Sequence, residues 1–281
     1  MATAAALRRD GGAGRLVATG LGNLALTALT LGLWHGWPPA AGAIARAVPA
    51  DRERSIGAAA EAAVIGGKRV CDAPEGRAAL DGLLAKLVAA GGLPAPAALR
   101  GRVVDDPTVN ALAAPGGEII VFRGLLDRAG SADELAGVLA REIGHVEHRH
   151  GLRGVVRAAG LFVLTGALSG GSDAAALGAA LVSLSYGRNF EREADAAAAR
   201  TLAAAGIGTA GLQAFFARME GERPGSSGGL WDYLGTHPAD ADRAAALRAA
   251  DRPATSAPAL PSAEWQSVRR ICRSARSAAG P

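Results

Sequence analysis

The most constraining feature of the sequence is a helix that carries a carboxylate in the middle of its apolar stripe. Residues 132–150 show helical spacing of apolar side chains, and Ser131 with Glu134 forms a capping box that marks the helix start. At about 100° per residue, Glu142 falls roughly 20° from the centre of this stripe, with His145 at its edge. A buried carboxylate without a partner is costly, so Glu142 requires a metal, a bound water or a cation.

A second helix carries a further pair of acidic groups. The segment that ends at Asp195 belongs to a long alanine-rich helical stretch, and Glu191 lies four residues before Asp195, hence on the same face. Apolar residues share that face, so both carboxylates are predicted to point into the core. Two helices that each bury acidic or imidazole groups indicate one shared site, and a divalent metal would explain both. Glu193 points elsewhere and is predicted to be a solvated charge.

Two segments resemble the signatures of a known family. They are Glu134–Gly151 (ELAGVLAREIGHVEHRHG) and Tyr186–Asp195 (YGRNFEREAD). Both resemble the HtpX-like and CAAX-prenyl-protease-type zinc metallopeptidases, with the bacterial periplasmic BepA-like and Oma-like branch the nearest. Residues 109–122 resemble the edge hairpin of that family, and Thr236–Pro238 with Arg243 resembles its late histidine motif.

The resemblance implies a role for each matching residue. Glu142 would be the general base, His145 and Glu191 would be zinc ligands, and Asp195 would orient an imidazole. His237 would approach the metal as an extra ligand or a gate. One Zn²⁺ per chain would lower the pKa of its bound water towards about 7, and Glu142 would take the proton during peptide hydrolysis.

The edge hairpin is the expected contact with a polypeptide substrate. The resemblance places Asn110 and Ala111 on its edge strand, where an extended substrate can pair through its main chain. Pro115-Gly116 suits a type II turn, in which glycine supplies the positive φ. Strands near 102–105 and 118–122 are predicted to form a small antiparallel sheet. A purely structural hairpin is the alternative.

Arg141 departs from the family pattern. It stands where the family has its first histidine ligand, and a histidine there would complete H-E-x-x-H. Arginine stays protonated and has no lone pair for zinc, and a charge about 4 Å from a metal costs on the order of 4 kcal/mol per unit of metal charge. Its guanidinium can instead fork onto Glu191 or Glu142.

Two functions therefore remain open. The first is a zinc endopeptidase that hydrolyses misfolded envelope proteins, with His237 completing the ligands. The second is a catalytically impaired relative that binds polypeptides in a chaperone-like manner.

The amino-terminal segment is predicted to meet a membrane. Leu16 to Trp34 is 19 residues without a charge, which is enough to span a bilayer. Three arginines before it keep that end in the cytoplasm: Arg8, Arg9 and Arg15. Residues 16–37 are expected to anchor the chain in the bacterial inner membrane with the domain facing the periplasm. A cleaved signal peptide, with Ala41–Ala43 as the cleavage site, is the alternative.

The two cysteines flank almost the whole region that carries the motifs. In an oxidising compartment Cys71 and Cys272 are expected to join and to tie the carboxy-terminal helix to the start of the domain. Closing a loop of about 200 residues stabilises a protein by up to about 5 kcal/mol in the chain-entropy model. Two unrelated buried thiols are the alternative.

The expected fold is α+β and mostly helical, a gluzincin-type metalloprotease domain with a small antiparallel sheet and an N-terminal membrane helix. Aromatic residues are only 4% of the chain, so small side chains on closely packed helices are expected to build the core. A net charge of +4 without a recognition motif excludes a nucleic-acid partner. The predicted divisions are a cytoplasmic N-terminus (1–15), an anchor or signal segment (16–37), a connector (38–50), the metallopeptidase domain (51–250), a linker (251–261) and a C-terminal helix (262–281).

Overall fold

The computed structural model describes residues 40–93, 99–157, 187–221, 241–251 and 257–273. The chain divides into two units, 1–47 and 48–281, and the elements below belong to the second. Its helices include α2 (Ala50–Ile65), α3 (Pro74–Gly91), α4 (Arg123–Arg128), α5 (Ala132–Glu147), α8 (Arg188–Ala204), α9 (Ala210–Gly221), α11 (Ala241–Ala249) and α12 (Ser262–Arg269). Its strands include β1 (Val70–Cys71), β2 (Arg100–Val104), β3 (Ala111–Ala114) and β4 (Glu118–Phe122).

The strands form one mixed sheet in the order β1-β2-β4-β3. β3 pairs antiparallel with β4, whereas β2 pairs parallel with β4, with Val103 opposite Val121. The prediction of an antiparallel sheet was therefore wrong for this pair. After β2 the chain crosses to the far edge and forms β3. It then returns through a tight hairpin, so that β4 inserts beside β2 in the same direction.

The hairpin between β3 and β4 has the predicted turn chemistry. Gly116 has a φ of 79° and a ψ of 6°, the values of the third residue of a type II turn. A Cβ on Gly116 would also lie 2.8 Å from the Cα of Arg54 in α2, so the turn and the helix pack backbone against backbone. Glycine is required here for both reasons.

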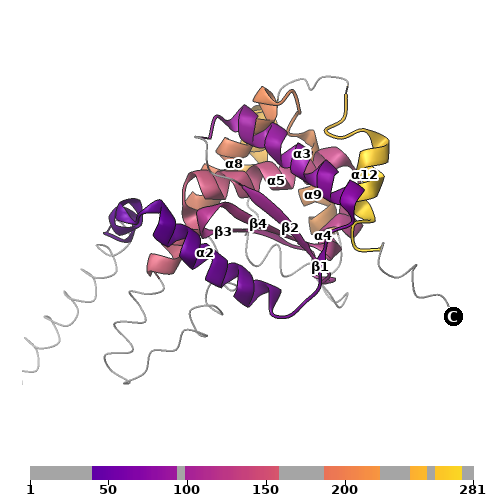
Figure 1. The fold of residues 1–281 in the computed structure, drawn as a ribbon. Helices are drawn as coiled ribbons and strands as arrows, with labels where there is room; N and C mark the ends of the chain where they lie inside the picture. The colour runs from indigo at the N-terminus through magenta and orange to yellow at the C-terminus, as the bar shows by residue number, and fades with distance from the viewer. Residues whose placement is uncertain (1–39, 94–98, 158–186, 222–240, 252–256, 274–281) are drawn as a thin grey trace, which may run out of the picture. The chain divides into compact units, whose positions relative to one another are not determined.

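Helices cover both faces of the sheet. Along the buried strand β4, Ile119 and Val121 belong to the main core with residues of α3 and α5. Ile120 and Phe122 alternate with them and pack with Val64 of α2 in a second cluster. Figure 1 shows α2 below the strands and α3 and α5 above them. The mostly helical α+β class predicted from the sequence is confirmed, with a mixed sheet.

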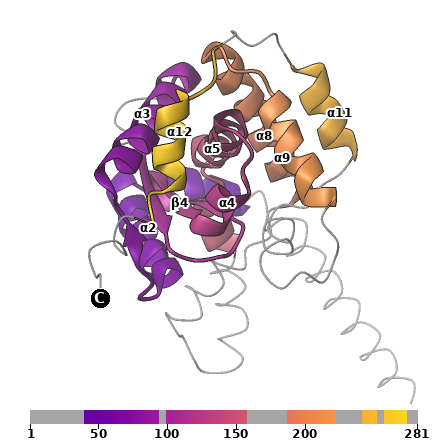
Figure 2. The ribbon, with the colours of Figure 1, turned by 90° about the vertical axis from the view of Figure 1, so that its right-hand side faces the viewer.

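Helix α5 lies in the middle of the helical layer. Figure 2 looks nearly along its axis, with α3 and α12 on one side and α8 and α9 on the other. The start of α5 is as predicted, since the Ser131 hydroxyl accepts the backbone N–H of Glu134 at 3.2 Å. The Glu134 carboxylate turns back to the N–H of Gly130 at 2.8 Å and also pairs with Arg218 of α9. The cap therefore fixes α5 against its neighbour.

The carboxy-terminal helix is shorter than the sequence suggested. α12 ends at Arg269, and a turn follows that brings Cys272 to Cys71 on β1. These cysteines form a disulfide with their Cα atoms 4.7 Å apart. Within the ranges that the structure describes, no helix has both the length and the apolarity to cross a bilayer. The expected anchor, 16–37, lies outside these ranges.

Candidate functional site

The two motif helices approach each other closely where their polar residues lie. A Cβ on Gly144 of α5 would lie 2.8 Å from the carbonyl oxygen of Ala194 on α8, so only glycine permits this distance. The approach brings four fully buried side chains together: Arg141, Glu142, His145 and Glu191. Asp195 joins them at 4% exposure. The residues predicted to converge from two helices do lie together.

Arg141 occupies the centre of the site. Its Nε lies 3.2 Å from an oxygen of Asp195, and its Nη1 lies 3.3 Å from an oxygen of Glu142. Its Nη2 donates to Glu191. One guanidinium thus contacts all three buried carboxylates, whereas the sequence predicted a contact with Glu191 or Glu142. Asp195, expected to orient an imidazole, is held by guanidinium groups instead.

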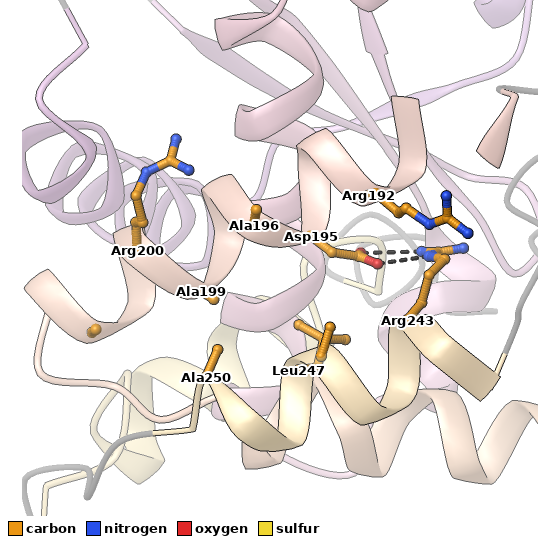
Figure 3. A pocket seen from close by; sticks show the side chains of 10 residues that line it. Arg192, Asp195, Ala196, Ala199, Arg200, Arg243, Leu247 and Ala250 are labelled. Carbon is orange, nitrogen blue, oxygen red and sulfur yellow. Dashed lines mark hydrogen bonds and ion pairs between the residues drawn. The ribbon is translucent and has the colours of Figure 1, made fainter. Parts of the chain in front are cut away.

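A second arginine reaches the same carboxylates from α11. The Nε of Arg243 lies 2.6 Å from Asp195, and its Nη2 lies 3.0 Å from Glu191. Figure 3 shows the two hydrogen bonds that Arg243 makes with Asp195, from Nε and from Nη2. From the sequence, Arg243 was noted only as part of the late histidine motif, and no partner was predicted for it. Two fixed positive charges thus face Glu191 and Asp195. The site has three carboxyl groups, so with Glu142 it holds one more acid than it has guanidinium groups.

The surroundings of Glu142 strongly favour its protonated form. Burial raises its pKa to about 8, and the charges of Glu191 and Asp195 add to the rise, while Arg141 opposes it. A backbone hydrogen bond from Ala113 of β3 also favours the ionised form. That bond shows that the outer edge of β3 faces the carboxylate.

The register explains which backbone groups of β3 face outward. The N–H of Phe122 donates to the carbonyl of Asn110 at 3.0 Å, so these two form a hydrogen-bonded pair. In an antiparallel ladder such pairs alternate, so Ala111 and Ala113 direct their N–H and C=O groups away from β4. Asn110 and Ala111 thus lie at the predicted edge. They are 7% and 0% exposed, so this edge is covered.

A break after α5 creates contacts that the sequence did not predict. The helix expected to run to 150 ends at Glu147, and Arg149 has a φ of 52°. Its guanidinium binds Glu53 at 2.5 Å and the carbonyl of Val48 at 2.9 Å, which offsets the strain of a left-handed residue. The turn brings His150 back against His145.

His150 was not singled out from the sequence, and the partners of Glu193 were not predicted. In a continuous helix residues 145 and 150 would lie about 140° apart, but their Nδ1 atoms are 3.0 Å apart. Glu193, predicted to be a solvated charge, accepts from His150 at 2.8 Å and from Arg153 at 3.1 Å. These pairs lower the pKa of Glu193 against the opposing effect of burial. Burial lowers the pKa of His150 to about 4, so its ring is neutral.

The described side chains do not fit a zinc ion as they stand. His145 Nε2 lies 3.7 Å from Glu191, but Glu191 is already paired with two guanidinium groups. Arg141 fills the position of the missing ligand. His237 lies outside the described residues. In the part of the chain that the structure describes, the set of three candidate ligands with converging atoms is Cys71, Asp105 and Cys272, whose cysteines form the disulfide.

A cavity of about 430 Å³ adjoins the site between α8 and α11. The Asp195–Arg243 ion pair lies at its wall, as Figure 3 shows. Its remaining lining is mainly alanine with Leu247, and Arg192 and Arg200 stand on α8. The cavity is therefore apolar with basic groups around it.

Comparisons with known proteins agree with the arrangement. The family model described as Peptidase family M48 matches residues 74–251, more than half of the chain. An Arabidopsis thaliana protein named mitochondrial metalloendopeptidase OMA1 is 33% identical over 154 residues, which is 53% of this chain and 31% of that protein. A Vibrio cholerae protein named putative beta-barrel assembly-enhancing protease is 33% identical over 156 residues, 50% of this chain and 32% of that protein.

A third relative is more similar in size. The Escherichia coli protein named metalloprotease YcaL is 29% identical over 156 residues, which is 52% of this chain and 60% of that protein. This chain spans about a third of the length of the first two relatives. The resemblance noted in the two helical motifs is confirmed by these matches.

Proposed function

We propose, from the premise that this chain belongs to peptidase family M48, that it binds polypeptides without hydrolysing them. The relatives are named as metalloproteases, so the family is one of metallopeptidases. The observation that carries the proposal is the contact of Arg141 with three buried carboxylates, where the family resemblance implies a catalytic metal.

The electrostatics of the site support this substitution of an arginine for a metal. A guanidinium cannot be deprotonated and donates no lone pair. It would repel a divalent ion about 4 Å away by on the order of 4 kcal/mol per unit of metal charge. Arg141 meanwhile supplies one of the two positive charges that balance the buried carboxylates of Glu191 and Asp195. Zinc and Arg141 thus compete for one position.

The edge of β3 supports the binding of an extended polypeptide. The N–H of Ala113 is held by Glu142, but the N–H and C=O groups of Ala111 also point outward, and a bound chain can add there as a further strand. The apolar cavity between α8 and α11 can receive a side chain of the same ligand. Because Ala111 is fully buried, the edge has to be uncovered before pairing.

A zinc-dependent endopeptidase is the second candidate, and one observation favours it. Nε2 of His145 lies 3.7 Å from a carboxylate oxygen of Glu191, so two of the implied zinc ligands already face each other. A metal could enter only if Arg141 left the centre and another residue, such as His237, completed the ligands.

The periplasmic face of the inner membrane is the proposed location for either function. The disulfide between Cys71 and Cys272 supports an oxidising compartment. Misfolded envelope proteins remain the proposed polypeptide ligands.

Metal content and hydrolysis test the proposal. We expect the purified chain to hold little zinc and R141H to hold nearly one ion per chain. R141H should also cleave an unfolded protein at least about tenfold faster, because the repelling charge becomes a ligand. The matched control is R200H, which changes an exposed arginine on α8 that pairs with Glu147. Stoichiometric zinc in the unaltered chain, lost in E191Q together with peptide cleavage, would establish the second candidate instead.

A binding measurement tests the edge strand separately. A111P removes an outward N–H from β3 and should weaken binding of a permanently unfolded polypeptide severalfold, measured by fluorescence anisotropy. V70P is the matched control, because Val70 begins the opposite edge strand and its N–H also faces away from its partner, as the Asp105-to-Arg69 bond shows. Equal losses in both variants, or none in A111P, would contradict binding at β3.

A further inference from the structure

His150 links a buried imidazole to a carboxylate near the surface. Its Nδ1 lies 3.0 Å from Nδ1 of His145, and its Nε2 lies 2.8 Å from Glu193. His145 and His150 are fully buried, whereas the Glu193 side chain is 41% exposed. The three groups form a chain from the protein exterior to the site, and the proposed function uses none of these contacts.

The position of His150 is set by packing on both sides. Its ring stacks on Phe190 of α8 with centroids 4.2 Å apart and planes 4° apart. His148 stacks against it at 5.4 Å. Arg153 lies over Phe190 and also pairs with Glu193 at 3.1 Å. Neither the ring nor its carboxylate partner is therefore free to turn away.

The hydrogen bonds among Glu193, His150 and His145 determine which ring nitrogens carry protons. A carboxylate only accepts, so His150 must carry its proton on Nε2. A neutral imidazole has one N–H, so Nδ1 of His150 is an acceptor. The atom facing it, Nδ1 of His145, must then be the donor. A neutral His145 with its proton on Nδ1 has an unprotonated Nε2.

We propose that Glu193 and His150 are positioning residues that fix His145 in the Nδ1-protonated tautomer. Nε2 then presents its lone pair towards Glu191, whose carboxylate oxygen is 3.7 Å away. Two acceptors that face each other favour a cation beside them, and the guanidinium of Arg141 supplies it by donating to Glu191. The arrangement goes beyond the proposed function, since it holds whether or not the chain hydrolyses peptides.

Nuclear magnetic resonance of the full chain labelled with ¹⁵N on histidine tests the proposal. The chain has five histidines, so replacing each in turn assigns the ring signals. At neutral pH we expect His145 to show a protonated Nδ1 and an unprotonated Nε2, and His150 the reverse. Observation of the proton of His145 on Nε2, or on both nitrogens, would overturn the proposal without any variant.

Two variants test the cause. E193M removes the acceptor and should replace the single tautomer of His145 by a mixture, and H150F should do the same by removing the intermediate ring. E147M is the matched control, because Glu147 is also a helix carboxylate paired with an arginine, Arg200, between α5 and α8. A single Nδ1-protonated tautomer retained in E193M would exclude a role for Glu193. If H150F does not fold, the tautomer of His145 measured in E193M and in the unaltered chain still tests the proposal.

Discussion

At the scale of single residues, Arg141 and Glu142 show how neighbouring positions divide the charge of one buried site. Arg141 and Arg243 balance Glu191 and Asp195, and Glu142 is left to hold a proton. With two arginines, two ionised carboxylates and one protonated acid, the site is electrically neutral without a metal. The substitution is coherent because each buried charge keeps a partner.

The raised pKa of Glu142 predicts a pH dependence of stability. The folded pKa, about 8, exceeds the ordinary value of 4.5, so this group stabilises the fold fully below about 4.5. Its contribution falls as the pH rises and is lost by about 8, by on the order of a few kcal/mol in all. Urea unfolding of the unaltered chain and of E142Q across this range measures it. The stability of E142Q should fall less with pH, and parallel curves would contradict the assignment.

The sequence predicted part of this site at the residue scale. Helical periodicity was enough to bring Glu142, His145, Glu191 and Asp195 together, because each lies on a face shared with apolar residues. It could not predict His150 or Glu193, since their contact depends on a helix break at Arg149. That break is stabilised by Glu53, almost a hundred positions away. Local patterns contain no information about such a distant partner.

At the scale of elements, the ion pairs of the site connect three helices. Arg141 of α5 and Arg243 of α11 both bind the carboxylates of α8. Because these contacts are buried, removing either arginine leaves one guanidinium to balance two buried carboxylates. The network therefore holds α11, which is only nine residues long, against the rest of the domain.

R243M tests this connection. We expect a loss of about 3–5 kcal/mol in the free energy of unfolding, because Arg243 is 4% exposed and its partners remain buried. R200M should cost at most about 1 kcal/mol, since the Arg200 side chain is 60% exposed. Denaturant unfolding of both variants measures the difference. Equal small losses would mean that α11 is held by its apolar contacts alone.

The start of a helix was easier to predict from the sequence than the direction of a strand in the sheet. Capping residues and glycines mark helix ends locally, as Ser131 does for α5. The direction of β2 relative to β4 depends on which edge β3 takes, and that choice is made by packing against α5. Spacing along the chain did not distinguish the mixed sheet from an antiparallel one.

At the scale of the whole molecule, the disulfide joins residues 201 positions apart. It ties the turn after α12 to β1, at the edge of the sheet, while α12 packs on α3. The whole of the matched family region, residues 74–251, lies inside the loop that it closes. The loop is long, so its closure restricts the unfolded chain strongly.

Replacing both cysteines by serine should lower the free energy of unfolding by up to about 5 kcal/mol. Denaturant unfolding with and without a reductant measures this change. The unaltered chain should lose the same stability on reduction, and the double variant should not respond to reductant at all. A double variant as stable as the oxidised chain would show that α12 is held by packing with α3 alone.

The same bridge has a consequence for the fate of a damaged molecule. A single backbone cut anywhere between Cys71 and Cys272 produces two pieces that stay covalently attached. In an oxidising environment the two fragments of such a nicked molecule stay linked, and the fold can be retained. Only a change to reducing surroundings would let the fragments separate and expose their apolar interiors to degradation.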